Sequence, residues 1–178
     1  NEEVVAIANR EKNVLKTVVI DAGHGGKDPG CLGKHSKEKD VALSIALQLG
    51  EMIERLQPDV KVIYTRNTDV FIPLNERAHI ANRAGADLFI SIHCNAHELP
   101  EKFGTETYIM GLHVSKSNLQ VAMRENSVIL QESDHQKKYD GFNPNSTPSY
   151  ILLSNYQTAY QDNSLNLASK IENQFECK

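Results

Sequence analysis

The chain has 178 residues, of which 40% are apolar and 24% are charged, and its formal net charge is −4. This length suits a single domain over 1–178 with a core of its own, and the charge gives no electrostatic reason to expect binding to nucleic acid or to an anionic membrane. Because no apolar run approaches the roughly 20 residues of a membrane-spanning helix, no membrane span is expected either.

The two ends of the chain are interpreted as cuts. It opens on Asn1 instead of a methionine and stops at Lys178, just after an expected helix. We therefore expect that a signal peptide was removed and that the C-terminal end is missing. Residues 1–14 are charged and are expected to be a lead-in segment.

Apolar periodicity predicts alternating strands and helices over the first two thirds of the chain. Strands are expected over residues 17–21, 60–65, 88–93 and 103–110. One helix is expected to start near Glu38 and to stop at Pro58, and a second to start after Pro73 and to stop at Gly85. The loop over 25–37 between the first strand and the first helix is rich in glycine and proline.

This order of elements predicts an α/β fold. It favours a twisted, mostly parallel sheet with right-handed crossovers and helices on both faces. The pattern changes after Ser115, where a long helix over 117–132 is expected, then a polar stretch over 133–149, then a closing helix over 156–175.

Two histidines and one glutamate are the candidate metal ligands. His24 follows the first strand, His93 ends the third, and Glu38 opens the helix after the glycine-rich loop. The carboxyl ends of parallel strands meet at one edge of a sheet, where ligands usually bind. Two histidines and a carboxylate are typical of a catalytic zinc, which leaves one position open and lowers the pKa of a bound water to about 7.

The residues alone leave other interpretations open. Each histidine could be an ordinary hydrogen-bonded polar group, and Glu38 could be a first-turn acid favoured by the helix dipole. The loop over 23–26 could bind phosphate, although it lacks the Lys-Ser/Thr of a P-loop and the Gly-x-Gly-x-x-Gly pattern.

Four motifs in order resemble the zinc-dependent N-acetylmuramoyl-L-alanine amidases. They are Val19-Ile20-Asp21-Ala22-Gly23-His24-Gly25-Gly26 with Asp28-Pro29-Gly30, Glu38-Lys39-Asp40, Thr65-Arg66-x-x-Asp69 with Arg77, and Ser91-Ile92-His93-Cys94-Asn95-Ala96. The resemblance implies that His24, Glu38 and His93 bind Zn²⁺. It also implies cleavage of the amide between N-acetylmuramic acid and the L-alanine of the stem peptide, with peptidoglycan as the substrate and a periplasmic or extracytoplasmic location. Arg66, Asp69 and Arg77 are expected to hold a loop through an arginine–carboxylate pair.

One part of the family pattern is not found in the sequence. The resemblance implies a late glutamate, on an apolar strand, that acts as general base. Glu172 and Glu176 lie in a polar helical stretch and do not match it, so the catalytic glutamate is expected beyond Lys178. The chain is then expected to bind zinc and to hydrolyse poorly. The alternative function is a catalytically inactive, zinc-containing module that binds peptidoglycan or a partner protein.

The segment over roughly 115–160 resembles the regulatory insert of the cell-division amidases. There a helix covers the active site, and a glutamate fills the open zinc position until an activator protein displaces it. Glu125 is the best match and Glu132 the second. The alternative is that both are solvated acids on a helix face.

Overall fold

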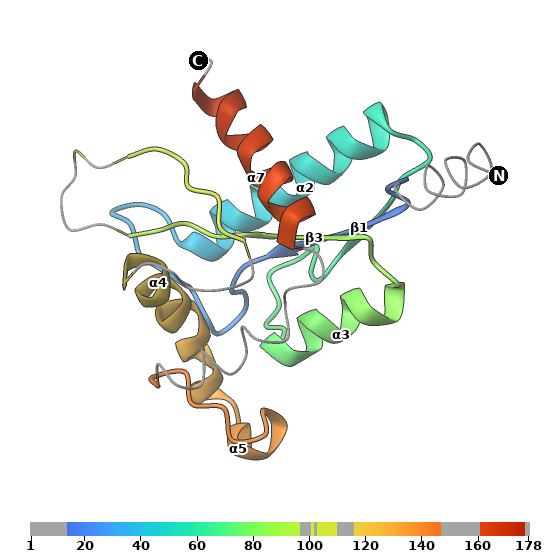
Figure 1. The fold of residues 1–178 in the computed structure, drawn as a ribbon. Coiled ribbons are helices and arrows are strands. Elements are labelled where there is room, and N and C mark those ends of the chain that lie inside the picture. Colours follow the sequence, from blue (N-terminus) through green and yellow to red (C-terminus); the bar gives the residue numbers. More distant parts are fainter. Residues whose placement is uncertain (1–13, 97–100, 102, 110–115, 147–160, 177–178) are drawn as a thin grey trace. The chain divides into compact units, whose positions relative to one another are not determined.

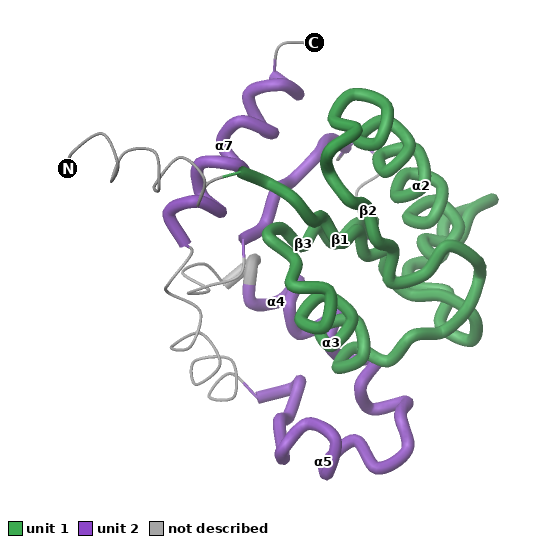
Figure 2. Tube along the Cα trace, turned by 90° about the vertical axis from the view of Figure 1, so that its right-hand side faces the viewer, with its two compact units in different colours: residues 1–95 green, residues 96–178 purple. Residues whose placement is uncertain are grey.

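The computed structural model describes residues 14–96, 101, 103–109, 116–146 and 161–176 (Figure 1). The chain divides into two compact units, Asn1–Asn95 and Ala96–Lys178 (Figure 2). Almost all of the expected lead-in segment and the part of the insert over 147–160 lie outside the described residues. The single domain over 1–178 stays a prediction, and each unit is described by itself.

The first unit contains a parallel sheet of three strands in the order β2-β1-β3. The strands are β1 (Thr17–Ala22), β2 (Lys61–Tyr64) and β3 (Leu88–Ile92). Val19 of the central strand pairs with Ile63 on one side and with Phe89 on the other. The expected strands over 17–21, 60–65 and 88–93 are therefore confirmed to within a residue or two at their ends.

Two helices cover opposite faces of this sheet: α2 (Glu38–Leu56) and α3 (Leu74–Ala84) (Figure 2). Helix α2 ends just before Pro58, and α3 follows Pro73, as expected. Gly85 closes α3 in the left-handed conformation at φ 59°, which is the usual role of a glycine at a helix end. The predicted α/β architecture is confirmed.

The core of the first unit lies between α2 and the sheet. Val18 and Ile20 of β1 are fully buried and belong to one cluster with Ala46 of α2 and Val60 before β2. β1 is apolar along nearly its whole length because, as the central strand, it is covered on both faces. Burial of each such valine or isoleucine side chain stabilises the fold by about 1.5–3 kcal/mol. This packing fixes the position of the end of β1, which His24, the first candidate ligand, follows.

The second unit is mainly helical in its described residues. It contains α4 (Lys116–Asn126), the 3₁₀ helix η1 (Ser127–Gln131), α5 (His135–Lys138) and α7 (Gln161–Glu176). The expected α-helix over 117–132 is therefore too long. The Asn126 side chain donates to the Ala122 carbonyl, and the Ser127 hydroxyl donates to the Arg124 carbonyl. Where the α-helix ends, side-chain donors therefore compete with backbone N–H groups for the carbonyl oxygens.

The expected fourth strand over 103–110 is wrong for the residues that the structure describes. Residues 103–109 are not a strand, and Met110 lies outside the described part. Alternation alone predicted this strand, but a strand also needs a paired neighbour, which a local pattern does not supply. The closing helix α7 ends within a residue of its expected end at 175, although the stretch 147–160 before it is not described.

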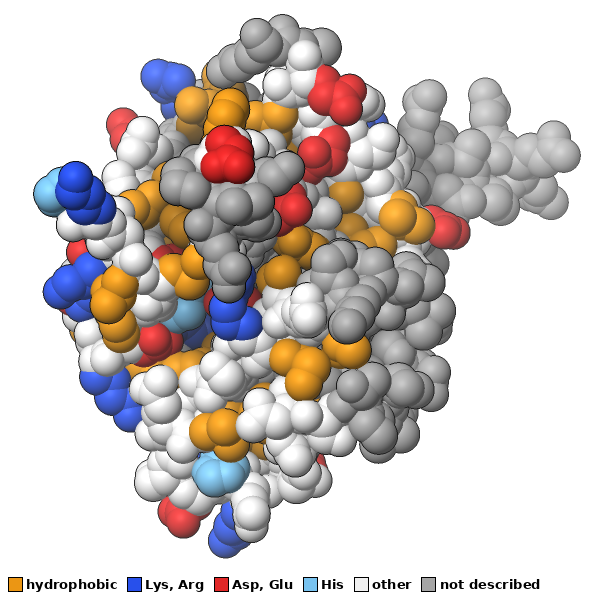
Figure 3. Space-filling view, turned by 90° about the vertical axis from the view of Figure 1, so that its left-hand side faces the viewer, with side chains coloured by type: hydrophobic (Ala, Val, Ile, Leu, Met, Phe, Trp, Pro, Cys, Tyr) orange, Lys and Arg blue, Asp and Glu red, His pale blue; other side chains and the backbone are white. Residues whose placement is uncertain are grey.

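Two general properties of the described residues bear on the partners. None of the helices over these residues is both long and apolar enough to cross a membrane. On the face drawn in Figure 3, acidic and basic side chains both appear among apolar ones. This distribution agrees with the small net charge of −4.

Candidate metal centre

The loop after β1 presents His24 in an unusual backbone conformation. His24 has φ 60°, in the left-handed region that residues other than glycine rarely adopt. Its carbonyl oxygen accepts a hydrogen bond of 2.7 Å from Nη2 of Arg77 on α3. A conformation of this kind costs of order 1–3 kcal/mol and persists only where the surroundings impose it. Arg77 is one of the groups that impose it.

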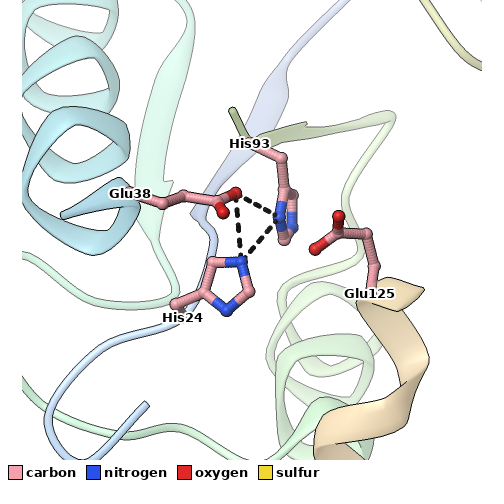
Figure 4. Close-up of side chains that lie close together, drawn as sticks. All are labelled: His24, Glu38, His93 and Glu125. Atoms are coloured by element: carbon pink, nitrogen blue, oxygen red, sulfur yellow. Dashed lines mark hydrogen bonds and ion pairs between the residues drawn. The ribbon is translucent and has the colours of Figure 1, made fainter. Parts of the chain in front are cut away.

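His24, Glu38 and His93 point toward one another from three different elements (Figure 4). Nε2 of His24 lies 3.0 Å from Oε1 of Glu38, and Nδ1 of His93 lies 3.1 Å from the same oxygen. The two ring nitrogens lie 3.2 Å apart. The three predicted ligands thus present three atoms at the corners of a nearly equilateral triangle. Glu125, also labelled in Figure 4, lies on α4 of the second unit.

This triangle has the dimensions of a zinc site. For ligand bonds of about 2.0–2.1 Å in a tetrahedron, neighbouring ligand atoms are about 3.3 Å apart, close to the three distances found here. The two imidazole rings are nearly perpendicular, at 78°. The three atoms are good metal ligands, and few protons are available to form hydrogen bonds between them. A cation therefore fits this arrangement. The His93 side chain is 28% exposed, against 9% for His24 and 0% for Glu38, so it is the most solvent-accessible of the three.

Glu38 is held as a charged carboxylate. Burial raises the pKa of Glu38, but hydrogen bonds with His24 and His93 outweigh it and hold that pKa well below its usual range. The backbone N–H groups of Cys31 and Cys94 add to this effect, each donating at 2.8 Å to one of the two carboxylate oxygens. A buried, ionised glutamate beside two histidines supplies the negative charge that a divalent cation needs.

Two glycines leave the space in which the ligands sit. A Cβ on Gly23 would lie 2.5 Å from an atom of the His93 ring. A Cβ on Gly30, which also has φ 66°, would lie 2.6 Å from the His24 ring and 2.7 Å from Oε2 of Glu38. Contacts this short do not occur, so any larger residue at either position would displace a ligand.

A buried ionic cluster joins the strand ends below the ligands. Asp21 at the end of β1 accepts hydrogen bonds from Thr65 after β2, from Ser91 of β3 and from Arg77 of α3. Burial raises the pKa of Asp21, but the Arg77 guanidinium and the two hydroxyl groups outweigh it and lower that pKa below its ordinary value. One carboxylate thus ties three strands and a helix together beside the candidate site.

The expected arginine–carboxylate pairing is confirmed in part. Arg77 pairs with a carboxylate, that of Asp21, at 2.7 Å. Arg66 donates to carbonyl oxygens, including those of Ala22 and Gly23. Asp69 instead accepts from the Lys39 ammonium at 2.5 Å and from the backbone N–H of Gly26 at 2.7 Å. The contacts of Arg66 and Asp69 hold the backbone of Ala22, Gly23 and Gly26, on either side of His24.

The sequence suggested no role for Asp28 or Asp21. In the structure, Asp28 contacts His24, and Asp21 is the carboxylate of the buried ionic cluster. Asp28 Oδ2 accepts a 2.8 Å hydrogen bond from Nδ1 of His24. The four-residue spacing between them in the glycine-rich loop was a signal that could have suggested this contact. Asp21 had no such signal, because its partners lie 44–70 residues further along the chain.

The sequence profile of the N-acetylmuramoyl-L-alanine amidases matches residues 18–178. The chain belongs to this amidase family. The match begins in β1 and includes the loop, helix and strand that carry all three candidate ligands.

Individual amidases show the same relationship. The N-acetylmuramoyl-L-alanine amidase AmiA of Escherichia coli is 34% identical over 157 residues, which are 88% of this chain and 53% of AmiA. AmiC of Escherichia coli is 40% identical over 104 residues, 58% of this chain and 24% of AmiC. The solved catalytic domain of CwlV, an N-acetylmuramoyl-L-alanine amidase from Bacillus (Paenibacillus) polymyxa var. colistinus, is 38% identical, with a TM-score of 0.51 and coverage of 62% of each chain. The chain spans about half or less of the length of these two curated amidases.

The acidic residues of the second unit differ in their surroundings. Glu125 on α4 accepts from the guanidinium of the neighbouring Arg124 at 2.9 Å. Glu132 is buried and accepts a 2.8 Å hydrogen bond from the Tyr139 hydroxyl. Glu172 lies on helix α7, not on a strand, and accepts from the Thr107 hydroxyl.

Proposed function

We propose that this chain is the zinc-binding part of a peptidoglycan hydrolase. The bond cleaved is the amide between N-acetylmuramic acid and the L-alanine that begins the stem peptide. One observation carries the proposal: in a member of the amidase family, the side chains of His24, Glu38 and His93 converge within 3.0–3.2 Å. Peptidoglycan lies outside the cytoplasmic membrane, so the proposal includes a periplasmic or extracytoplasmic location.

The three side chains have distinct tasks in this proposal. Nε2 of His24, Nδ1 of His93 and Oε1 of Glu38 hold the ion, and the buried carboxylate offsets one of its two charges. When bound, zinc supplies a Lewis acid that activates water for attack on an amide carbonyl. The exposed side of His93 is where a glycan-linked peptide reaches the centre. The Asp21 cluster and the glycine-rich loop hold the three donors in place.

No glutamate in residues 1–178 matches the sequence pattern of the general base in this family. A positioned base contributes about 10²–10⁴-fold to such a reaction, so we expect slow cleavage by the 178-residue chain. The alternative function, an inactive zinc-containing module that binds peptidoglycan or a partner, requires no cleavage at all. Membership of the amidase family favours the hydrolase.

Digestion of purified sacculi tests the function. The zinc-loaded chain, used at high concentration, is expected to release stem peptides whose first residue is L-alanine, and mass analysis detects even a small yield. Removal of zinc by a chelator is expected to stop the release, and zinc to restore it. Cleavage at any other bond would contradict the proposed substrate bond. Binding to sacculi without any zinc-dependent release would support the inactive module.

We propose further that α4 regulates the site. In this proposal the Glu125 carboxylate fills the open metal position until an activator protein displaces the helix. Carboxylates are good zinc ligands, so such a contact would block water. Glu125 suits this task better than Glu132, because Glu132 is buried in its own unit against Tyr139. Glu125, in contrast, accepts from Arg124, a neighbour on the same helix whose side chain is 37% exposed.

The substitution Glu125→Ala is expected to raise the basal rate of stem-peptide release and the rate at which a chelator withdraws zinc. Coupling between two sites typically changes such quantities by about 5–150-fold. Glu132→Gln is the comparison variant and is expected to change neither rate by more than about twofold, since it keeps an acceptor for Tyr139. Unchanged rates in Glu125→Ala would remove Glu125 from this role, and an increase in Glu132→Gln alone would transfer the role to Glu132.

A further inference from the structure

We infer that Asp28 is a positioning residue for the metal: its carboxylate fixes the proton of His24 on Nδ1, so that the lone pair of Nε2 faces the other two donor atoms. This inference rests on the proposed zinc-binding function and deepens it. Asp28 is assigned no direct bond to the metal. Its effect is expected on the affinity for zinc.

The contact between the two side chains is short and shielded from water. Oδ2 of Asp28 lies 2.8 Å from Nδ1 of His24, and each side chain is only 9% exposed. An ionised carboxylate can only accept a hydrogen bond, so Nδ1 is the nitrogen that carries the proton. Nε2 of His24 faces Oε1 of Glu38 at 3.0 Å and Nδ1 of His93 at 3.2 Å, and without a metal ion it shares a proton with that carboxylate. A metal ion would replace this proton, and the ring would then keep its remaining proton on Nδ1, where Asp28 accepts it.

The carboxylate of Asp28 is itself held in place by the backbone. Asp28 and Gly25 exchange two backbone hydrogen bonds, of 2.9 and 3.1 Å, and Oδ1 of Asp28 accepts from the N–H of Gly30 at 3.2 Å. The other oxygen, Oδ2, is therefore aimed at the imidazole by a rigid turn. A partner fixed in this way restricts both the rotation and the tautomer of the ring.

His24 needs such a restraint because of its backbone. Its left-handed conformation at φ 60° is held from the main-chain side by Arg77, which donates to the carbonyl oxygen. Asp28 holds the ring side. Nδ1 and Nε2 lie on opposite edges of the imidazole, so Asp28 is separated from the other two donor atoms by the ring. This arrangement matches the histidine–carboxylate pairs that typically improve metal affinity by 10–100-fold.

Zinc affinity, measured by competition with a chromogenic chelator on the full chain, tests the inference. Asp28→Ala is expected to bind zinc about 10–100-fold more weakly than the wild-type protein. Asp28→Asn keeps an acceptor oxygen without the charge and is expected to lie between the two. Asp69→Ala is the matched control, because it removes a carboxylate that holds the same loop through Gly26 and Lys39 without touching His24. It is expected to lose less than threefold in zinc affinity.

A second measurement separates positioning of the ring from general loosening of the loop. Nitrogen-15 NMR of the metal-free protein is expected to show His24 with its proton on Nδ1 in the wild type and in Asp69→Ala. Asp28→Ala is expected to lose this preference. A cooperative thermal unfolding transition shows that each variant is folded. If Asp28→Ala does not fold, Asp28→Asn is compared with the wild type in its place.

The outcomes distinguish the inference from the function on which it rests. If the wild-type protein binds zinc and the Asp28 variants bind it within threefold of wild type, the inference is overturned and the function stands. An equal loss in Asp69→Ala, or an unchanged His24 tautomer in Asp28→Ala, also overturns it. If the wild-type protein binds no zinc, the proposed function fails.

Discussion

Glu38→Gln is expected to weaken zinc binding by more than about 100-fold, the largest functional effect of any single change in the described residues. Loss of a partner that only orients a ligand already costs about 10–100-fold, and Glu38 is a proposed ligand. Its buried side chain supplies the only negative charge among the three donors that converge at 3.0–3.2 Å. A neutral amide gives neither that charge nor a good zinc ligand.

The amide introduces a second conflict. Both oxygens of Glu38 accept backbone N–H groups, from Cys31 and Cys94, so the amide –NH₂ would meet a donor on one side. Chelator competition and metal analysis of the purified protein measure the loss of zinc. The matched control is Glu76→Gln on α3, an exposed carboxylate paired with Arg83, which is expected to leave zinc binding unchanged. Zinc binding by Glu38→Gln within tenfold of wild type would contradict the ligand assignment.

Arg77→Met is expected to lower the free energy of unfolding by about 3–5 kcal/mol, the usual cost of removing one partner of a buried ion pair. Among the described residues, the variant leaves buried Asp21 with Thr65 and Ser91 as its hydrogen-bond donors. It also removes the hydrogen bond that holds the carbonyl of His24. Because a chain of this size loses roughly 2–4 °C in Tm per kcal/mol, the expected decrease is roughly 6–20 °C.

The pH dependence of this variant identifies the cause. In the wild-type protein the pKa of Asp21 is lowered on folding, so its contribution to stability is present above the ordinary pKa and is lost as the pH falls through the folded value. In Arg77→Met, burial is no longer offset by the guanidinium, the pKa of Asp21 rises, and protonation relieves the buried charge. The deficit in unfolding free energy relative to wild type is therefore expected to shrink between pH 7 and pH 4.

Urea denaturation at the two pH values measures this difference. Arg83→Met is the control on the same helix, because Arg83 is 63% exposed and solvent screens its pairing with Glu76, so that the pair contributes little to stability. The double variant Arg77→Met, Asp21→Asn is expected to recover part of the lost stability, since it carries no buried charge at this position. A deficit in Arg77→Met no larger than that of Arg83→Met would contradict the role given to the cluster.

The features that the sequence predicted well are those with a local cause. Pro58, Pro73 and Gly85 mark the helix ends because proline and glycine restrict or permit particular backbone conformations wherever they stand. The three strands were recognisable from short apolar runs. His24 and His93 were found together because both directly follow strands of one parallel sheet.

The features that the sequence did not predict depend on groups that are far apart in the chain. Asp21 is indistinguishable from any other strand-end acid until Thr65 and Ser91 are placed beside it. Lys39 stands in a run of charged residues, yet it is buried and its ammonium contacts Asp69 and the carbonyl of Gly26. The end of α4 at Asn126 is decided by competition between side chains and the helix for the same carbonyl groups, which apolar periodicity does not register.

The convergence of the three donors has a consequence for the cohesion of the first unit. His93 lies 55 residues from Glu38 and 69 from His24 along the chain, and these segments meet only when β3 has paired with β1. An ion on the three donors would act as a cross-link that closes both long loops, and its binding free energy would add to the free energy of folding. The ion proposed for cell-wall chemistry would then also resist the separation of β3 from the rest of the sheet.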